Sequence, residues 1–211
     1  MEENNPLRYA GTRWQIRFCS YEGVEEYAVN ELQKIVQSFL PYVIQTTPLR
    51  EDTLPADSHL ILVGIPTQNH ILAQMLEQCG LPMPEKPEAF TLACTTHPNY
   101  PGLRCLLLAG NDPNGVLYAV QELGKKLANT IPVQGIAHPV DIHARRAVLD
   151  NLPDFKIHDY PRFQNRGLWT WGYVIHDYRG YLDHMARLKM NMLVTWNDTP
   201  PLNYARVREY A

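Results

Sequence analysis

The first 130 residues alternate between short apolar runs and longer segments with apolar residues at helical spacing. "RWQIRFC" from Arg13 predicts a strand. The segment after it begins with Ser20 as a helix cap and repeats apolar residues such as Ala28 and Leu32 along one helical face. "HLILVG" from His59 is continuously apolar, as in a strand covered on both faces, and "NHILAQMLEQCG" follows it with a helical stripe. The pattern predicts two successive strand–helix pairs.

Two further strands are predicted in "AFTLACT" and "RCLLLAG", joined by the Pro-rich turn "HPNYPG". The second strand leads through a glycine turn into "NDPNGVLYAVQELGKKL". There Asp112 and Pro113 form the usual pair of N-cap and first helical residue. Residues 12 to about 130 therefore indicate one α/β domain.

The stretch between residues 129 and 165 looks different. "NTIPVQGIAHPV" contains Gly and Pro and reads as a connector, and "HARRAVLDNLPDFKIHDYPRF" reads as an irregular, Pro-punctuated approach to the next element. We expect a boundary near residue 150, with one domain over residues 1–150 and a second over residues 151–211.

A strand–helix–strand pattern occupies the second part. "RGLWTWGY" predicts an aromatic strand, "DYRGYLDHMARLKMN" a helix capped by Asp177, and "MLVTWND" a second strand, in the order of a βα-barrel. Arg166 stands at the start of the first strand, and a buried cation requires a partner or a ligand. In such barrels the chemistry lies at the C-terminal strand ends, which here hold Trp171 and the pair Asn197 and Asp198.

Composition and charge exclude several classes of protein. The chain has 211 residues, 45% of them hydrophobic, and a formal net charge of -3. Its Lys and Arg residues are scattered, so we expect no nucleic-acid partner. No apolar run approaches the roughly 20 residues of a membrane span, so we expect no membrane partner. The N-terminus lacks the apolar region of a secretory signal, which predicts a cytoplasmic protein.

The four cysteines have no C-x-x-C spacing and lie inside apolar runs. This arrangement favours buried, reduced thiols over disulfides or metal ligands, and a reducing compartment. It also argues against an activated cysteine nucleophile.

Two further motifs bear on cofactors. "LLLAGNDPNG" resembles a phosphate-binding turn, but it lacks the third glycine of G-x-G-x-x-G, and Asp112 would put a carboxylate where a phosphate binds. "HPVDIH" brings His138, Asp141 and His143 together, although the spacing is not that of a known zinc motif. An ordinary capped turn and surface histidines are favoured, so we expect no cofactor and no metal.

Three marks in the second part carry a family resemblance: "PRFQNRG", "MARLKMN" and "LVTWND", in this order. With them the chain resembles the family 20 glycoside hydrolases, the β-N-acetylhexosaminidases, and more loosely families 84 and 67. The resemblance implies a non-catalytic N-terminal α/β domain with a mixed sheet flanked by helices. It also implies that the first strand, helix and strand of a (β/α)₈ barrel follow, so that the barrel is incomplete in this chain.

The resemblance also implies site residues. The family's substrate-binding arginine falls on Arg166, which either binds sugar hydroxyls or only ties the barrel strand to the domain interface. The acidic residue that the family has in this strand is replaced by Trp171, a departure from the hexosaminidase pattern. Trp169 and Trp171 either form a sugar-stacking platform or fill a barrel core. Asn197 and Asp198 lie where a sugar could be hydrogen-bonded, and a structural role is the alternative for Asp198.

The resulting expectation for function has two forms. In the first, the chain is the N-terminal part of a carbohydrate-active glycoside hydrolase that cleaves O-glycosyl bonds. The family's catalytic acids come from the fourth barrel strand, so the fragment alone is expected to be inactive. In the second, it is a stand-alone carbohydrate-binding or protein-interaction module. A carbohydrate is the expected partner of the full-length parent, and self-association through residues 166–199 is expected because the barrel strands would have unpaired edges.

Overall fold

The computed structural model describes residues 12–50, 54–129, 142–171 and 175–196. The chain divides into two compact units, Met1–Tyr160 and Pro161–Ala211. No helix in the described part of the chain is long and apolar enough to cross a lipid bilayer.

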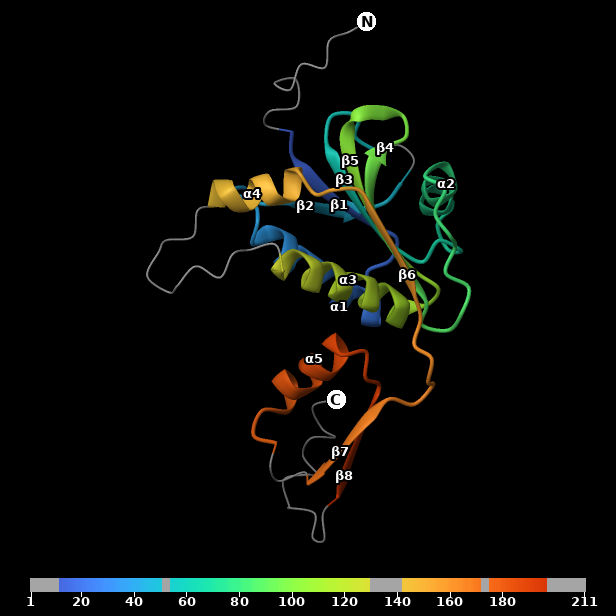
Figure 1. Cartoon of the computed structure of the whole chain (residues 1–211), viewed down its shortest axis with the longest axis vertical. Coiled ribbons are helices and arrows are strands. Elements are labelled where there is room, and N and C mark those ends of the chain that lie inside the picture. The colour runs from blue at the N-terminus through green and yellow to red at the C-terminus, as the bar shows by residue number, and fades with distance from the viewer. Residues whose placement is uncertain (1–11, 51–53, 130–141, 172–174, 197–211) are drawn as a thin grey trace, which may run out of the picture. The chain divides into compact units, whose positions relative to one another are not determined.

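The first unit is built on a six-stranded mixed sheet (Figure 1). Its strands are β1 (Trp14–Phe18), β2 (Gln45–Pro48), β3 (His59–Gly64), β4 (Phe90–His97), β5 (Tyr100–Gly110) and β6 (Phe155–Asp159). Their spatial order is β2-β1-β3-β5-β4-β6. The pairs β2–β1, β1–β3 and β3–β5 are parallel, whereas β4 runs antiparallel to both β5 and β6. This confirms the expected α/β fold with a mixed sheet.

Helices cover both faces of this sheet. Helices α1 (Gly23–Gln37) and α3 (Pro113–Ala128) pack side by side on one face, and α2 (His70–Gln78) covers the other (Figure 1). Leu60 and Leu62 of β3 point toward α2, where they join one core cluster with Leu72 and Leu76. Continuous burial of β3 follows from this two-sided cover, as its unbroken apolar run predicted.

Local sequence signals and structure agree at most helix ends. The side chain of Asp112 caps α3 by accepting from the Gly115 amide, as predicted. Ser20, however, is not the cap of α1. The helix begins one residue after Glu22, whose side chain makes no capping bond, and the Ser20 hydroxyl is hydrogen-bonded to the Glu25 carboxyl instead.

The expected irregular approach before residue 163 is wrong. It contains the helix α4 (Ile142–Asp150) and the edge strand β6, which pairs with β4 from Phe155 opposite Cys94 to Asp159 opposite Phe90. Because β6 completes the sheet, the first unit extends to Tyr160 rather than ending near residue 150. Only one face of β6 meets the rest of the fold, so its sequence lacks the continuous apolar run of β3.

The second unit contains β7 (Gly167–Trp171), α5 (Tyr178–Arg187) and β8 (Met192–Trp196). Strands β7 and β8 pair in parallel, with Gly167 opposite Met192 and Trp171 opposite Trp196. The predicted strand–helix–strand unit is therefore confirmed as a βαβ unit.

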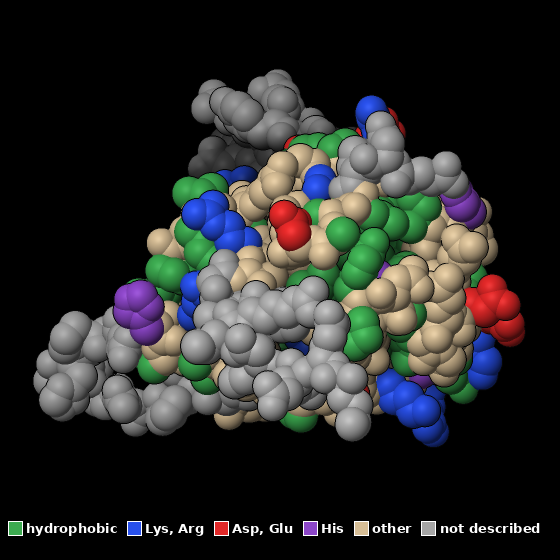
Figure 2. Space-filling model, turned by 90° about the horizontal axis from the view of Figure 1, so that it is seen from above, with side chains coloured by type: hydrophobic (Ala, Val, Ile, Leu, Met, Phe, Trp, Pro, Cys, Tyr) green, Lys and Arg blue, Asp and Glu red, His purple; other side chains and the backbone are tan. Residues whose placement is uncertain are grey.

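On the face shown in Figure 2, Lys and Arg side chains lie at several separate places, with hydrophobic side chains between them. The basic residues visible there do not form a continuous stripe.

Candidate functional site

The predicted site residues belong to the βαβ unit or to its flanks. Leu168 and Leu193 are partly buried and point to one face of the strand pair, whereas Trp169, Met192 and Val194 point to the other and are exposed. Met185 of α5 is buried to 4% exposure. One face of the pair therefore presents large apolar side chains to solvent.

The structure explains why the "PRFQNRG" mark ends in a glycine, Gly167. A Cβ atom at this position would lie 2.5 Å from the Met192 carbonyl oxygen and 3.0 Å from the Met192 Cβ. Only a residue without a side chain lets β7 approach β8 this closely. The glycine is thus required for strand pairing, whatever the unit does chemically.

The "ARLKMN" mark ends helix α5. The amide of Lys189 donates to the carbonyl of Ala186, and the amide of Met190 donates to the carbonyl of Met185 at 2.9 Å. This is the bonding pattern of a Schellman C-cap, in which the residue after the cap takes a left-handed conformation. Lys189 does so, with φ of 59°.

Arg166 is bound to the same turn. Its guanidinium Nε donates to the carbonyl oxygen of Lys189, and its Nη1 donates to the carbonyl oxygens of Phe163 and Gln164. The Asn191 side chain closes the network, because its Oδ1 accepts from the Arg166 amide at 2.9 Å and its Nδ2 donates to the Gln164 carbonyl at 2.8 Å. These contacts hold Arg166 to the backbone of the second unit, and its two expected roles, sugar binding and a tie to the domain interface, both stay predictions.

The predicted site residues do not all come together. Arg166 precedes β7 and Trp171 ends it, so the length of the strand, on the order of 15 Å, separates them. Trp171 does lie at the C-terminal strand end, as predicted. Asn197 and Asp198 lie outside the described residues.

Trp169 and Trp171 form the most exposed aromatic pair of the unit. Their exposed fractions are 58% and 37%, and their ring centroids lie 5.6 Å apart in an edge-to-face arrangement. Both side chains project from one face of β7, and Thr170, between them, projects from the other face. Exposed indole rings of this kind can pack against the apolar face of a sugar ring.

The glycine turn before α3 does not offer a free anion site. The Asp112 carboxylate accepts from the Gly115 amide at 2.9 Å and from the Glu88 amide at 2.6 Å, so it occupies the end of the helix. A Cβ atom at Gly115 would lie 2.3 Å from the Ala89 carbonyl oxygen. This glycine therefore serves close packing of the helix on the preceding loop.

The metal and cysteine candidates can be placed only in part. His138 and Asp141 lie outside the described residues. Among the residues that are described, no three His, Cys, Asp or Glu side chains are grouped as metal ligands. All four cysteines are free thiols. Burial raises the pKa of Cys19 to about 12 and also raises the pKa of Cys79, Cys94 and Cys105, which disfavours a nucleophilic thiolate.

Sequence reasoning missed a polar cluster at the N-terminal ends of β1 and β3. The centroid of the His59 ring lies 4.7 Å from that of the Trp14 ring, with the two planes tilted by 41°, and the His59 Nδ1 accepts from the Arg104 amide at 2.9 Å. The Trp14 indole donates to Asp150 at 2.7 Å, and Arg146 pairs with the same carboxylate. These contacts hold α4 against the sheet. In the sequence, the only signal of this cluster was His59, a histidine at the first position of an otherwise apolar strand.

Burial holds the pKa of His59 down to about 4, and the positive charges of Arg104 and Arg146 act in the same direction against Asp150. The imidazole is therefore neutral at pH 7. With Nδ1 accepting a hydrogen bond, its proton is assigned to Nε2.

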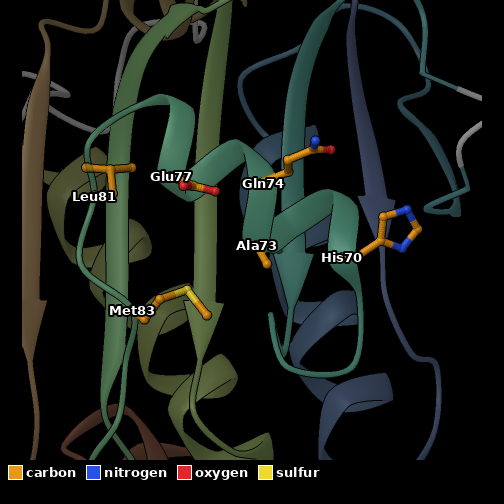
Figure 3. A pocket seen from close by; sticks show the side chains of 6 residues that line it. All are labelled: His70, Ala73, Gln74, Glu77, Leu81 and Met83. Atoms are coloured by element: carbon orange, nitrogen blue, oxygen red, sulfur yellow. The ribbon is translucent and has the colours of Figure 1, made fainter.

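A surface depression of about 570 Å³ lies along α2 (Figure 3). His70, Gln74 and Glu77 border it from the helix, and Leu81 and Met83 from the segment that follows. It combines an apolar floor with a few polar groups, and it shares no residue with the predicted site.

The sequence matches no protein-family model, and a search of curated proteins gives no match.

Proposed function

We propose that this chain is the N-terminal part of a carbohydrate-active, hexosaminidase-like glycoside hydrolase, in which β7 and β8 are the first two strands of a larger barrel. The observation that supports this most is the parallel pairing of β7 with β8 across α5. Within the described residues neither strand pairs with any other strand. An isolated two-stranded sheet is marginally stable, so further strands at its edges would complete it.

The exposed apolar face supports the same proposal. In a βα-barrel the helices pack outside, so the face opposite α5 becomes the interior. Trp169, Met192 and Val194 share one face of the strand pair and are between 40% and 58% exposed, and the proposal assigns this face to the interior. Large side chains of this kind fill a barrel core once neighbouring strands are present.

Two experiments test the proposal. Assays of the 211-residue chain with aryl glycosides of N-acetylglucosamine, glucuronic acid and galactose should give no turnover above a heat-denatured control, because the resemblance assigns the acids to the fourth strand. The coding DNA downstream of Ala211 should continue with further strand–helix units and a carboxylate pair at a strand end. Robust turnover that survives repurification, or a stop codon at that point, would contradict the proposal.

The alternative is a stand-alone carbohydrate-binding or protein-interaction module, which the exposed Trp169 and Trp171 pair favours. Titration with N-acetylglucosamine oligosaccharides should then change the tryptophan fluorescence. The change should be lost in Trp169→Ala or Trp171→Ala and kept in Phe163→Ala, an exposed aromatic outside the strand pair. Equal responses of all three variants would argue against stacking on this face.

The proposal includes a cytoplasmic location, supported by the four free cysteines. It also includes self-association of the isolated chain through β7 and β8, since unpaired strand edges and an exposed apolar face both attract partners.

A further inference from the structure

Arg17 is a buried cation in the sheet of the first unit, on the strand next to the edge strand β2. It belongs to β1 and is 6% exposed. Its Nη2 donates to the Gln15 side-chain oxygen at 2.7 Å, and its Nε is buried without a hydrogen-bond partner. Among the described residues, no carboxylate forms an ion pair with it. An uncompensated buried charge of this kind is costly, and burial accordingly lowers the pKa of Arg17.

Thr47 adds a second unsatisfied group next to it. The two residues are direct register partners on the parallel strands β1 and β2, so their side chains leave the same face of the sheet. The Thr47 hydroxyl is buried and has no hydrogen-bond partner. A guanidinium N–H and a hydroxyl thus stand side by side with donor capacity that the described protein groups do not use.

The neighbours of Arg17 on the described strands β1, β2 and β3 carry no negative charge. Leu62 of β3 is the register partner on the other side of Arg17, and Cys19, just after β1, packs against the core cluster that contains Leu62. The Gln15 amide that contacts Arg17 donates onward to the Ser58 hydroxyl, which in turn donates to Asp57. The nearest carboxylate in this chain of hydrogen bonds is therefore two residues removed from the guanidinium.

Strand β2, which carries Thr47, is the edge of the sheet, and its first residue, Gln45, is exposed. The Arg17 Nε and Thr47 Oγ1 atoms are themselves buried, so a solute reaches them only where this edge strand gives way.

We propose that Arg17 and Thr47 form a binding site for a small oxyanion, of the phosphate or carboxylate type. The planar guanidinium presents N–H groups in the geometry that oxyanions accept, and the hydroxyl supplies one more donor. The anion neutralises the buried charge and satisfies both orphaned groups. This site lies in the first unit and does not depend on the function proposed for the βαβ unit.

Thermal unfolding of the full chain, followed by circular dichroism, tests the proposal. Tens of millimolar phosphate or acetate are compared with sodium chloride at the same ionic strength. An anion that binds only the folded state should raise the Tm by about 2–4 °C. The shift should disappear in Arg17→Met and shrink in Thr47→Val. It should persist in Arg162→Met, which removes the same charge from an exposed position.

A response to phosphate alone or to acetate alone supports the site and identifies the type of oxyanion. The proposal is overturned if neither anion shifts the wild-type Tm, or if Arg17→Met keeps the full shift. Should Arg17→Met fail to fold, Thr47→Val decides: loss of at least half of the shift supports the site, and an unchanged shift overturns it.

Discussion

The carbonyl oxygen of Lys189 accepts a hydrogen bond from the Arg166 guanidinium, and Lys189 is one of two non-glycine residues with positive φ in the described part of the chain. The cation thus binds the backbone at the point where helix α5 turns toward β8. Two of the marks that suggested a glycoside hydrolase meet in this contact. Their spacing therefore has a structural explanation in the helix end and the strand start that they join.

Lys189→Gly should stabilise the second unit by about 0.5–1 kcal/mol, because glycine adopts the left-handed conformation without a Cβ clash. The hydrogen bond from Arg166 goes to the backbone, so the substitution preserves it. Urea unfolding followed by tryptophan fluorescence measures the effect, since three of the four tryptophans follow residue 160. Lys189→Ala, which keeps the Cβ, is the control, and a glycine variant no more stable than the alanine variant would contradict the explanation.

Asp112→Ala should destabilise the first unit by about 1–2 kcal/mol. The substitution removes the acceptor for the Gly115 and Glu88 amides and thus the N-cap of α3. Asp112→Asn keeps one acceptor oxygen for the Gly115 amide but places an NH2 group against the Glu88 amide, so it should lose less than the alanine variant. Chemical denaturation of both variants provides the measurement, and equal losses would contradict a stabilising role of the bond to the Gly115 amide.

His59 should make the stability of the first unit depend on pH. Its pKa is about 4 in the folded chain and about 6.5 when unfolded, so between these values the unfolded state binds a proton that the folded state does not. The contribution of His59 to the free energy of unfolding is fully present above pH 6.5. It falls by about 3 kcal/mol as the pH drops from 6.5 toward 4.

Urea unfolding of wild type and His59→Gln from pH 4 to pH 7 measures this effect as the difference between their slopes. Glutamine keeps an acceptor for the Arg104 amide but does not titrate. His143→Gln, at an exposed position, controls for the loss of a histidine and should keep the wild-type slope. Identical slopes for wild type and His59→Gln would refute the prediction.

Limited trypsin digestion should cut first after Arg162 and leave Lys156 intact. Both side chains are exposed, but Lys156 lies in β6, whose backbone is hydrogen-bonded to β4. Trypsin cannot cut within residues 130–141, because that stretch has no Lys or Arg. Mass spectrometry of the first large fragment gives the site, and an initial cut after Lys156 would mean that β6 is not a firm part of the first unit.

The 211-residue chain should form dimers or larger species at tens of micromolar, since β7 and β8 expose an apolar face and pair only with each other in the described region. Trp169→Lys places a charge on that face and should shift the chain toward monomer. Gln78→Lys, at an exposed position of α2, should not. Light scattering coupled to size exclusion distinguishes these states, and a monomeric wild-type chain would rule out association through this face.

The sequence by itself determined the elements whose signals are local. The unbroken apolar run of β3, the cap at Asp112, and the strand–helix–strand pattern after Arg166 each depend on residues a few positions apart. Periodicity and capping chemistry act over one or two turns, so they can be read without knowing the fold.

Only the tertiary structure decided which polar groups meet. The edge strand β6 is held in the sheet by pairing with β4, which lies more than 60 residues earlier in the chain. Nothing in the composition of β6 indicates that partner. The bond from Arg166 to Lys189, the neutral state of His59 and the burial of Arg17 likewise depend on contacts between segments that are separate in sequence. Burial and hydrogen bonding set the free energy of a charged group, and both are properties of the assembled sheet rather than of its separate strands.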